Sequence, residues 1–258
     1  MRRVSRENWL VAASQAGIVV AIAAGWEAIG RSGWVDPEVL PPLSKVLTVL
    51  WGLLHQPSFL SDLRITFAEV VTAFAISVPF GLLIGFIVGE RRWLYRVVNP
   101  TIQLLMATPK AIFLPLFIIA LGIGFVERVM FATMIGLFAV ILSGIAAVHS
   151  VPQGLVTAAR SLGAARWQLY LQIYIPAMAP LIIGGIRLGL TFTIFGVLLS
   201  EMYASSNGIG HALVAWGEAY RLAELLAGVL LVVLVTVVLN ELIRLCEMRG
   251  SKRNQVGT

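Results

Sequence analysis

The residue of this chain best suited to act on a solute is Lys110, a cation in an apolar run between Pro109 and Pro115. An ionisable group near the centre of a membrane span costs about 2.5–3.5 kcal/mol to insert, so it usually faces a cavity or a partner. The two prolines remove backbone hydrogen bonds and can open polar carbonyls to a pathway. Lys110 therefore either lines a transport route and attracts an anionic solute, or it snorkels or pairs structurally with carbonyls or a carboxylate.

Motifs for enzymatic chemistry are absent from the sequence. A P-loop needs Gly-Lys-Ser/Thr to hold phosphates, but the three lysines are followed by Val46, Ala111 and Arg253. The patterns GxSxG and HExxH are missing as well. The single cysteine, Cys246, excludes an intrachain disulfide, and the three histidines are too scattered for a metal site. We expect no catalytic residue, no metal and no cofactor bound by this chain itself.

The composition is that of an integral membrane protein. Hydrophobic residues make up 59% of the 258 positions and charged residues only 12%, whereas soluble domains have about 45–50% and 25%. The length suits one membrane domain. The net charge of +6 comes from basic residues scattered in short loops, so membrane topology explains it better than nucleic-acid binding does.

Six apolar runs have the length of membrane spans, which predicts an all-α polytopic protein. They cover about residues 9–29, 65–89, 100–121, 126–148, 178–202 and 222–245. The first run is about 20 residues long, which favours a retained signal anchor over a cleavable signal peptide. We divide the chain into a tail with the first span (1–30), a connector with an amphipathic surface helix (31–62), a core domain (63–246) and a polar tail (247–258).

The positions of Lys and Arg predict the orientation in the membrane. One side collects Arg2, Arg3, Arg6, Arg91, Arg92, Arg96, Arg160, Arg166, Arg244, Arg249, Lys252 and Arg253, and the other holds Arg31, Lys45, Arg64, Arg128 and Arg221. Because positive loops stay in the cytoplasm, we expect both termini and the loop at residues 154–176 to be cytoplasmic.

Two patterns predict how helices pack and dock. Gly81, Gly85 and Gly89 recur every fourth residue and make a smooth face for close helix contact within the chain. In the 154–176 loop, apolar residues at helical spacing form a stripe, and Gly163 permits a bend. The stripe consists of Leu155, Ala158, Leu162, Ala165, Leu169 and Ile173. The other faces are too polar for a bilayer interior, so the loop is an amphipathic element. It either docks on a partner or lies among the lipid headgroups, and periodicity alone does not separate these two interpretations.

The loop resembles the EAA loop of permease subunits of binding-protein-dependent ABC importers. The matching residues are Ala158-Ala159, Gly163 and Ile173-x-Ile175-Pro176, while Thr157 and Ile175 replace the Glu and Leu of the family pattern. The run from Ala159 to Ala164 is similar to the branch that handles nitrate, sulfonates, taurine and pyrimidine precursors. The resemblance extends over about residues 35–246, through Thr108-Pro109-Lys110, Leu114-Pro115-Leu116 and Gly184-Gly185-Ile186-Arg187.

The resemblance implies a type I permease in a bacterial inner membrane. Its implied partners are a second permease copy, cytosolic ATPase subunits that bind ATP and magnesium, and a periplasmic or lipoprotein substrate-binding protein. The implied ATPase-coupling residues are Thr157, Ala158, Ala159, Arg160, Ser161, Leu162, Gly163, Ala164 and Ala165. A small anion fits Lys110, and a neutral pyrimidine precursor remains an alternative solute.

The expected translocation pathway consists of Thr108, Pro109, Lys110, Phe113, Arg187 and Glu201. Structural anchoring to carbonyls or to the second copy is the favoured role of Arg187, about 16 Å along the helix from Pro176. Glu201 either touches a periplasmic docking protein or is a solvated acid. A stand-alone channel or secondary transporter is the competing class, but it would need more internal ionisable groups, and we identify no intramembrane carboxylate.

Overall fold

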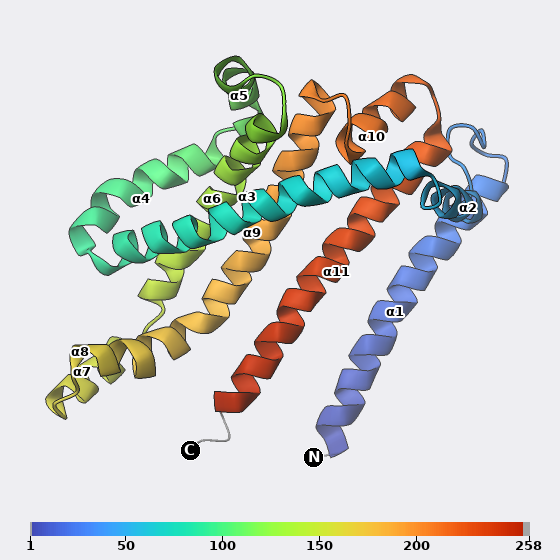
Figure 1. The fold of residues 1–258 in the computed structure, drawn as a ribbon. Coiled ribbons are helices and arrows are strands. Elements are labelled where there is room, and N and C mark those ends of the chain that lie inside the picture. The colour runs from blue at the N-terminus through green and yellow to red at the C-terminus, as the bar shows by residue number, and fades with distance from the viewer. Residues whose placement is uncertain (1, 255–258) are drawn as a thin grey trace. The chain divides into compact units, whose positions relative to one another are not determined.

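The structure is a computed structural model that describes residues 2–254, without the side chains of residues 2–8, 12 and 246–254. All regular elements in this part of the chain are helical (Figure 1). In chain order they are α1 (Arg2–Arg31), α2 (Leu43–Leu53), α3 (Pro57–Glu90), α4 (Arg92–Ala107), a 3-10 helix (Lys110–Phe113), α5 (Leu114–Leu121), α6 (Phe125–His149), α7 (Gln153–Ser161), α8 (Arg166–Leu169), a π-helix (Tyr170–Tyr174), α9 (Ile175–Ala204), α10 (Ile209–Glu218) and α11 (Leu222–Asn254).

Five helical segments are long and apolar enough to cross a membrane. They are Trp9–Arg31, Pro57–Glu90, Phe125–His149, Arg166–Ala204 and Leu222–Leu245. A sixth span is formed by α4 together with the segment Lys110–Leu121, and these two parts meet at an angle of 89°. The predicted all-α membrane fold is confirmed, and the six predicted spans correspond to these five segments and the bent pair.

The third span is broken at Pro109 but continuous at Pro115. Thr108 and Pro109 have extended backbones between α4 and the 3-10 helix. Pro115 lies at the first turn of α5, where its missing N–H costs no hydrogen bond. Lys110 therefore lies at the corner of a bent span and not near the middle of a straight one.

The chain forms two compact units, of which the first comprises residues 1–61 and 212–232. In this unit the carboxylate of Glu27 accepts hydrogen bonds from the backbone N–H and the hydroxyl of Ser44, both at 2.9 Å. The indole of Trp26 donates to the carbonyl of Pro41 at 3.1 Å. These bonds attach α1 to the start of α2, which is the helix expected in the connector.

The second unit comprises residues 62–211 and 233–258 and is built around α6. Glycines let α3 and α9 approach this central helix closely. A Cβ on Gly85 of α3 would lie 2.6 Å from the carbonyl oxygen of Ile141, and one on Gly196 of α9 would lie 2.8 Å from Cα of Ala132. The glycine face of α3 thus packs within the chain, as its spacing predicts.

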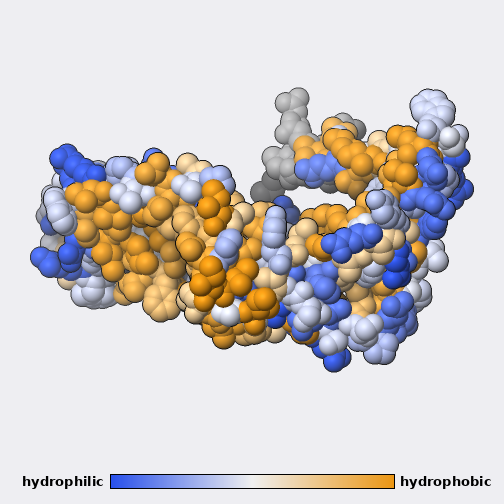
Figure 2. Space-filling view, turned by 90° about the horizontal axis from the view of Figure 1, so that it is seen from above, coloured by the Kyte–Doolittle hydropathy of each residue, from blue (hydrophilic) through white to orange (hydrophobic). Residues whose placement is uncertain are grey.

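Apolar side chains cover much of the surface that Figure 2 shows, and polar side chains gather in separate zones. Large exposed hydrophobic residues lie on every candidate span, for example Val19, Phe80, Ile119, Phe195 and Val237. Such a surface is suited to lipid or to other membrane helices.

Candidate functional site

The 154–176 loop folds as two short helices joined by a tight turn. Gly163 ends α7 with a φ of +81°, a left-handed conformation that favours glycine. The N–H of Gly163 donates to the carbonyl of Arg160, and the N–H of Ala164 to that of Ala159, both at 3.0 Å. On the other side of the turn, the amide oxygen of Gln168 accepts a hydrogen bond from the N–H of Ala165 at 2.7 Å. The bend expected at Gly163 is confirmed.

The loop buries one set of apolar residues and exposes another. Val156 packs with Ala147, Val148, Val151 and Met178 in a buried cluster. Leu155 and Trp167 are exposed, and Leu162 is 88% exposed. The apolar stripe expected from the sequence is therefore only partly available to a partner, because its member Leu169 is buried.

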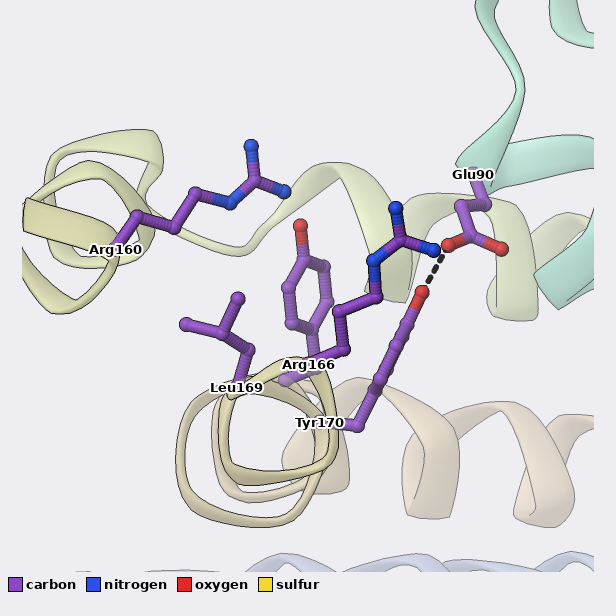
Figure 3. A pocket seen from close by; sticks show the side chains of 6 residues that line it. Glu90, Arg160, Arg166, Leu169 and Tyr170 are labelled. Atoms are coloured by element: carbon purple, nitrogen blue, oxygen red, sulfur yellow. Dashed lines mark hydrogen bonds between the residues drawn. The ribbon is translucent and has the colours of Figure 1, made fainter. Parts of the chain in front are cut away.

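A π-helix joins α8 to α9 and carries Tyr170. The Tyr170 hydroxyl donates a hydrogen bond to the carboxylate of Glu90, the last residue of α3 (Figure 3). The ring of Tyr170 also lies 6.1 Å from that of Phe86. These contacts connect the loop to the end of α3, although the two segments are 80 residues apart in the sequence.

A cavity of about 310 Å³ lies beside this hydrogen bond. Arg160, Arg166, Leu169 and Tyr174 line it together with Glu90 and Tyr170. In Figure 3 the guanidinium of Arg166 points toward Glu90, and Arg160 reaches toward the cavity from α7. The charged groups of the cavity wall are thus two guanidiniums and one carboxylate.

Lys110 is held at the corner of the broken span. Its ammonium donates to the carbonyl of Met106 at 2.8 Å and lies 5.9 Å from the ring centroid of Phe138. No carboxylate within the described residues forms an ion pair with it. Of its neighbours on the expected pathway, Thr108 and Phe113 are half-buried and Pro109 is exposed. The bond to a carbonyl, which belongs to the structural alternative for Lys110, is present, and a pathway role for these residues stays a prediction.

Arg187 occupies an interior position of α9 and is half-buried. Its buried Nε atom has no hydrogen-bond partner, and its guanidinium forms no ion pair with any side chain that the structure describes. One turn further along, Thr191 accepts a weak hydrogen bond from the amide of Asn240 at 3.4 Å. Within the described residues no carbonyl accepts a hydrogen bond from Arg187. Anchoring to the second copy, the other form of the favoured role, stays a prediction.

Glu201 is fully buried, with 0% exposure, so it is neither a solvated acid nor a surface for a docking protein. Its carboxylate accepts hydrogen bonds from the hydroxyl of Thr66 at 2.6 Å and from the N–H of Gly210 at 2.7 Å. The same hydroxyl of Thr66 accepts from the N–H of Ile209 at 2.9 Å. Glu201 therefore connects the end of α9 with α3 and with the first turn of α10.

Two further buried glutamates show that the expected absence of intramembrane carboxylates is wrong. Glu69 of α3 forms an ion pair with Arg128 of α6, with Oε1 and Nε 2.7 Å apart, and Arg128 also donates to the Ser205 hydroxyl. Glu127 accepts a hydrogen bond from the Ser200 hydroxyl at 2.8 Å. The sequence does show acidic residues within apolar runs, which could have indicated buried carboxylates. Their hydrogen-bond and ion-pair partners, however, are distant in the sequence.

Comparison with known proteins reveals relatives over almost the whole chain. Residues 77–246 match the family described as binding-protein-dependent transport system inner membrane component. The chain is 26% identical over 238 residues to the taurine transport system permease protein TauC of Escherichia coli (strain K12), covering 90% of this chain and 86% of that protein. It is 26% identical over 245 residues to a protein of Bacillus subtilis (strain 168) named as a candidate aliphatic sulfonates transport permease, SsuC, covering 95% and 87%.

A solved structure shares the fold. It is a crystal structure of a bacterial ABC transporter involved in the import of the acidic polysaccharide alginate. The TM-score is 0.65 at 14% sequence identity, and the match covers 95% of this chain and 96% of that chain. At this identity the likeness concerns the fold alone.

Proposed function

This chain belongs to the family of binding-protein-dependent transport system inner membrane components, and we propose that its solute is a small anion such as taurine or another sulfonate. The family makes the chain a multi-pass permease of a type I ABC importer. It is not an enzyme, because ATP hydrolysis lies in a partner subunit of such transporters.

Two cationic side chains inside candidate spans support the proposal of an anionic solute. Lys110 and Arg187 have no carboxylate partner in the part of the chain that is described. An unpaired charge inside the bilayer is costly, so it usually faces a cavity, a pathway or a partner. A sulfonate that passes these side chains would supply the missing negative charge. The names of the taurine and sulfonate relatives agree with this chemistry.

We propose that the pathway runs past the corner of the broken span. Thr108, Pro109, Lys110 and Phe113 lie at this corner, where the extended backbone leaves helical hydrogen bonds unmade. Arg187 would contribute from α9. Glu201 would act indirectly, because it is buried among Thr66, Ile209 and Gly210.

We also propose that the 154–176 loop docks on a cytosolic ATPase subunit, with residues 157–165 as the contact. The exposed side chains of Leu155 and Leu162 support this role, because apolar groups outside the bilayer favour burial against a protein. The working transporter would hold two copies of this chain, two ATPase subunits that bind ATP and magnesium, and a periplasmic or lipoprotein binding protein. The chain would lie in a bacterial inner membrane with both termini in the cytoplasm.

A pull-down from gently solubilised native membranes tests the docking. Wild type should co-purify with an ATPase subunit, and Leu162→Glu should lose it because a carboxylate replaces the most exposed leucine of the loop. Gln153→Glu is the matched control and should keep the ATPase subunit, since it adds the same charge at an exposed residue of α7 outside residues 157–165. Absence of any ATPase from the wild-type sample, even after crosslinking, would overturn the coupling proposal.

Uptake competition tests the solute. Cells that express the transporter should take up labelled taurine or an alkanesulfonate, with competition from other sulfonates. Competition by a pyrimidine precursor, with none by sulfonates or nitrate, would contradict the anionic solute and leave the family assignment intact.

A further inference from the structure

A second and larger cavity lies where α3 and α6 end. Its volume is about 580 Å³, and its lining includes Arg92, Tyr95, Arg96, His149, Gln153 and Tyr174. The sequence-based orientation puts these helix ends on the cytoplasmic side. The cavity is therefore expected at the level of the lipid headgroups of the cytoplasmic leaflet.

The lining of this cavity has a net positive charge, because it holds two arginines and one carboxylate. Arg92 and Arg96 are one turn apart on α4, so both guanidiniums lie on one face of that helix. Neither makes an ion pair or a side-chain hydrogen bond within the described part of the chain. Glu90 also lines the cavity and offsets one of these charges, and its carboxylate is held by a hydrogen bond from the Tyr170 hydroxyl.

The cavity wall is fixed by contacts between separate helices. Nε2 of His149 lies 3.1 Å from the carbonyl oxygen of Gly89, which joins the ends of α6 and α3. The ring of Tyr95 packs edge-on against the His149 ring, with centroids 4.3 Å apart. This contact attaches the first turns of α4 to the same junction. Arg92 and Arg96 therefore extend from a helix whose first turn is fixed to the junction of α3 and α6.

The outer side of α4 is apolar next to this basic face. Trp93 is 71% exposed, and Val97 and Leu104 follow it at helical spacing and are exposed as well. Tryptophan is enriched at the membrane interface, and aliphatic residues suit acyl chains. A ligand with a negative head and apolar tails would contact both faces of α4.

We propose that this cavity binds the phosphate group of an anionic phospholipid of the cytoplasmic leaflet, held by the guanidiniums of Arg92 and Arg96. Basic pockets between membrane helices on the cytoplasmic side are suited to such headgroups, and guanidinium matches phosphate in geometry and charge. The proposal rests on the orientation of the proposed permease but not on its solute. A phosphate group of a soluble molecule is the other source of the same chemistry.

The test measures lipid binding by the purified full-length chain. Short-chain phosphatidylglycerol and phosphatidylcholine are titrated in detergent, and bound lipid is counted by native mass spectrometry. Wild type should retain phosphatidylglycerol in preference to phosphatidylcholine. The double variant Arg92→Gln/Arg96→Gln should bind phosphatidylglycerol about 30-fold more weakly, from the usual contribution of each Arg near an anionic lipid surface.

Arg91→Gln is the matched control. Arg91 is the exposed neighbour that precedes α4 and does not line the cavity, so this variant should bind phosphatidylglycerol as wild type does. If Arg91→Gln lost as much phosphatidylglycerol binding as the double variant, the lipid would be attracted by the basic surface in general and not by this cavity. That result would overturn the proposal. Unfolding temperatures of all three proteins show whether the double variant is folded. If it is not, Arg96→Lys replaces it, which keeps the charge but loses the paired donors and should weaken binding less.

A competition experiment distinguishes a lipid phosphate from the phosphate of a soluble molecule. Inorganic phosphate and glycerol phosphate are added as competitors at constant ionic strength. If the cavity is a lipid site, neither should displace phosphatidylglycerol at concentrations well above that of the lipid. Displacement by inorganic phosphate at equal concentration would assign the cavity to a soluble phosphate and refute the lipid proposal.

Discussion

The hydroxyl of Tyr170 donates a hydrogen bond to the carboxylate of Glu90, which links the start of one membrane span to the end of another. Tyr170 belongs to the π-helix that follows the proposed docking loop, and Glu90 is the last residue of α3. A movement of the loop would therefore be passed to α3 as well as to α9.

The first prediction concerns this link. Tyr170→Phe keeps the ring and removes a hydrogen bond to a charged group, which is worth about 1.5–3 kcal/mol. We expect the uptake rate per ATP hydrolysed to fall about tenfold in the reconstituted transporter, because the bond transmits loop movement. Tyr174→Phe is the control, since the Tyr174 hydroxyl makes no hydrogen bond in the described structure. Unchanged coupling in Tyr170→Phe would contradict the role.

The second prediction concerns the two intramembrane cations. Lys110→Met and Arg187→Met should each raise KM for sulfonate uptake by about tenfold, because each removes one attractive charge from the proposed pathway. Lys45→Met makes the same change in charge at an exposed residue of α2 and should leave KM unaltered. Wild-type KM values in both variants, at normal protein levels, would exclude a pathway role.

The third prediction concerns the close contact of α3 and α6. Gly85→Ala should lower the unfolding temperature in detergent, because the added Cβ would lie 2.6 Å from the Ile141 carbonyl and 3.0 Å from Cα of Gly144. Overpacking of this kind costs about 1–3 kcal/mol. Gly184→Ala is the matched control, since a Cβ there meets nothing within 4 Å. Equal stabilities of the two variants would show that the helices separate easily.

The fourth prediction concerns the buried ion pair of Glu69 and Arg128. Arg128→Met leaves a buried carboxylate without its cation, and such a change costs about 3–5 kcal/mol. We expect a large drop in unfolding temperature, with partial recovery in the double variant Arg128→Met/Glu69→Gln. The absence of recovery would mean that the bonds of Arg128 to Ser205 and Asn207 are the more important ones.

Local patterns predicted most of the fold. Long apolar runs located the spans and Gly163 marked the turn, because these signals depend on neighbouring residues alone. Both Pro109 and Pro115 were expected to interrupt the third span, but only Pro109 does, since Pro115 lies in the first turn of α5. The π-helix from Tyr170 to Tyr174 was not predicted, since such turns are rare and no residue type specifies one.

The polar cluster of Glu69, Glu127, Arg128 and Glu201 shows where sequence reasoning fails. Glu201 and Thr66 are 135 residues apart, so only the packing of α3 against α9 reveals that this carboxylate is buried and bonded. The local sequence around a glutamate near the end of a span does not show whether its side chain faces water or the protein interior. The unpartnered Nε atom of Arg187 was likewise visible only after its described neighbours had been placed.

The π-helix also has a consequence for the length of the segment between Gly163 and Pro176. A π turn contains an extra residue relative to an α turn, and one residue corresponds to about 100° of helix rotation. Deleting a single residue between Tyr170 and Tyr174 would let α8 continue into α9 as a regular α-helix. The docking loop would then rotate relative to Arg187 and the rest of α9. Relatives that dock in the same way should therefore tolerate substitutions in this segment far better than insertions or deletions.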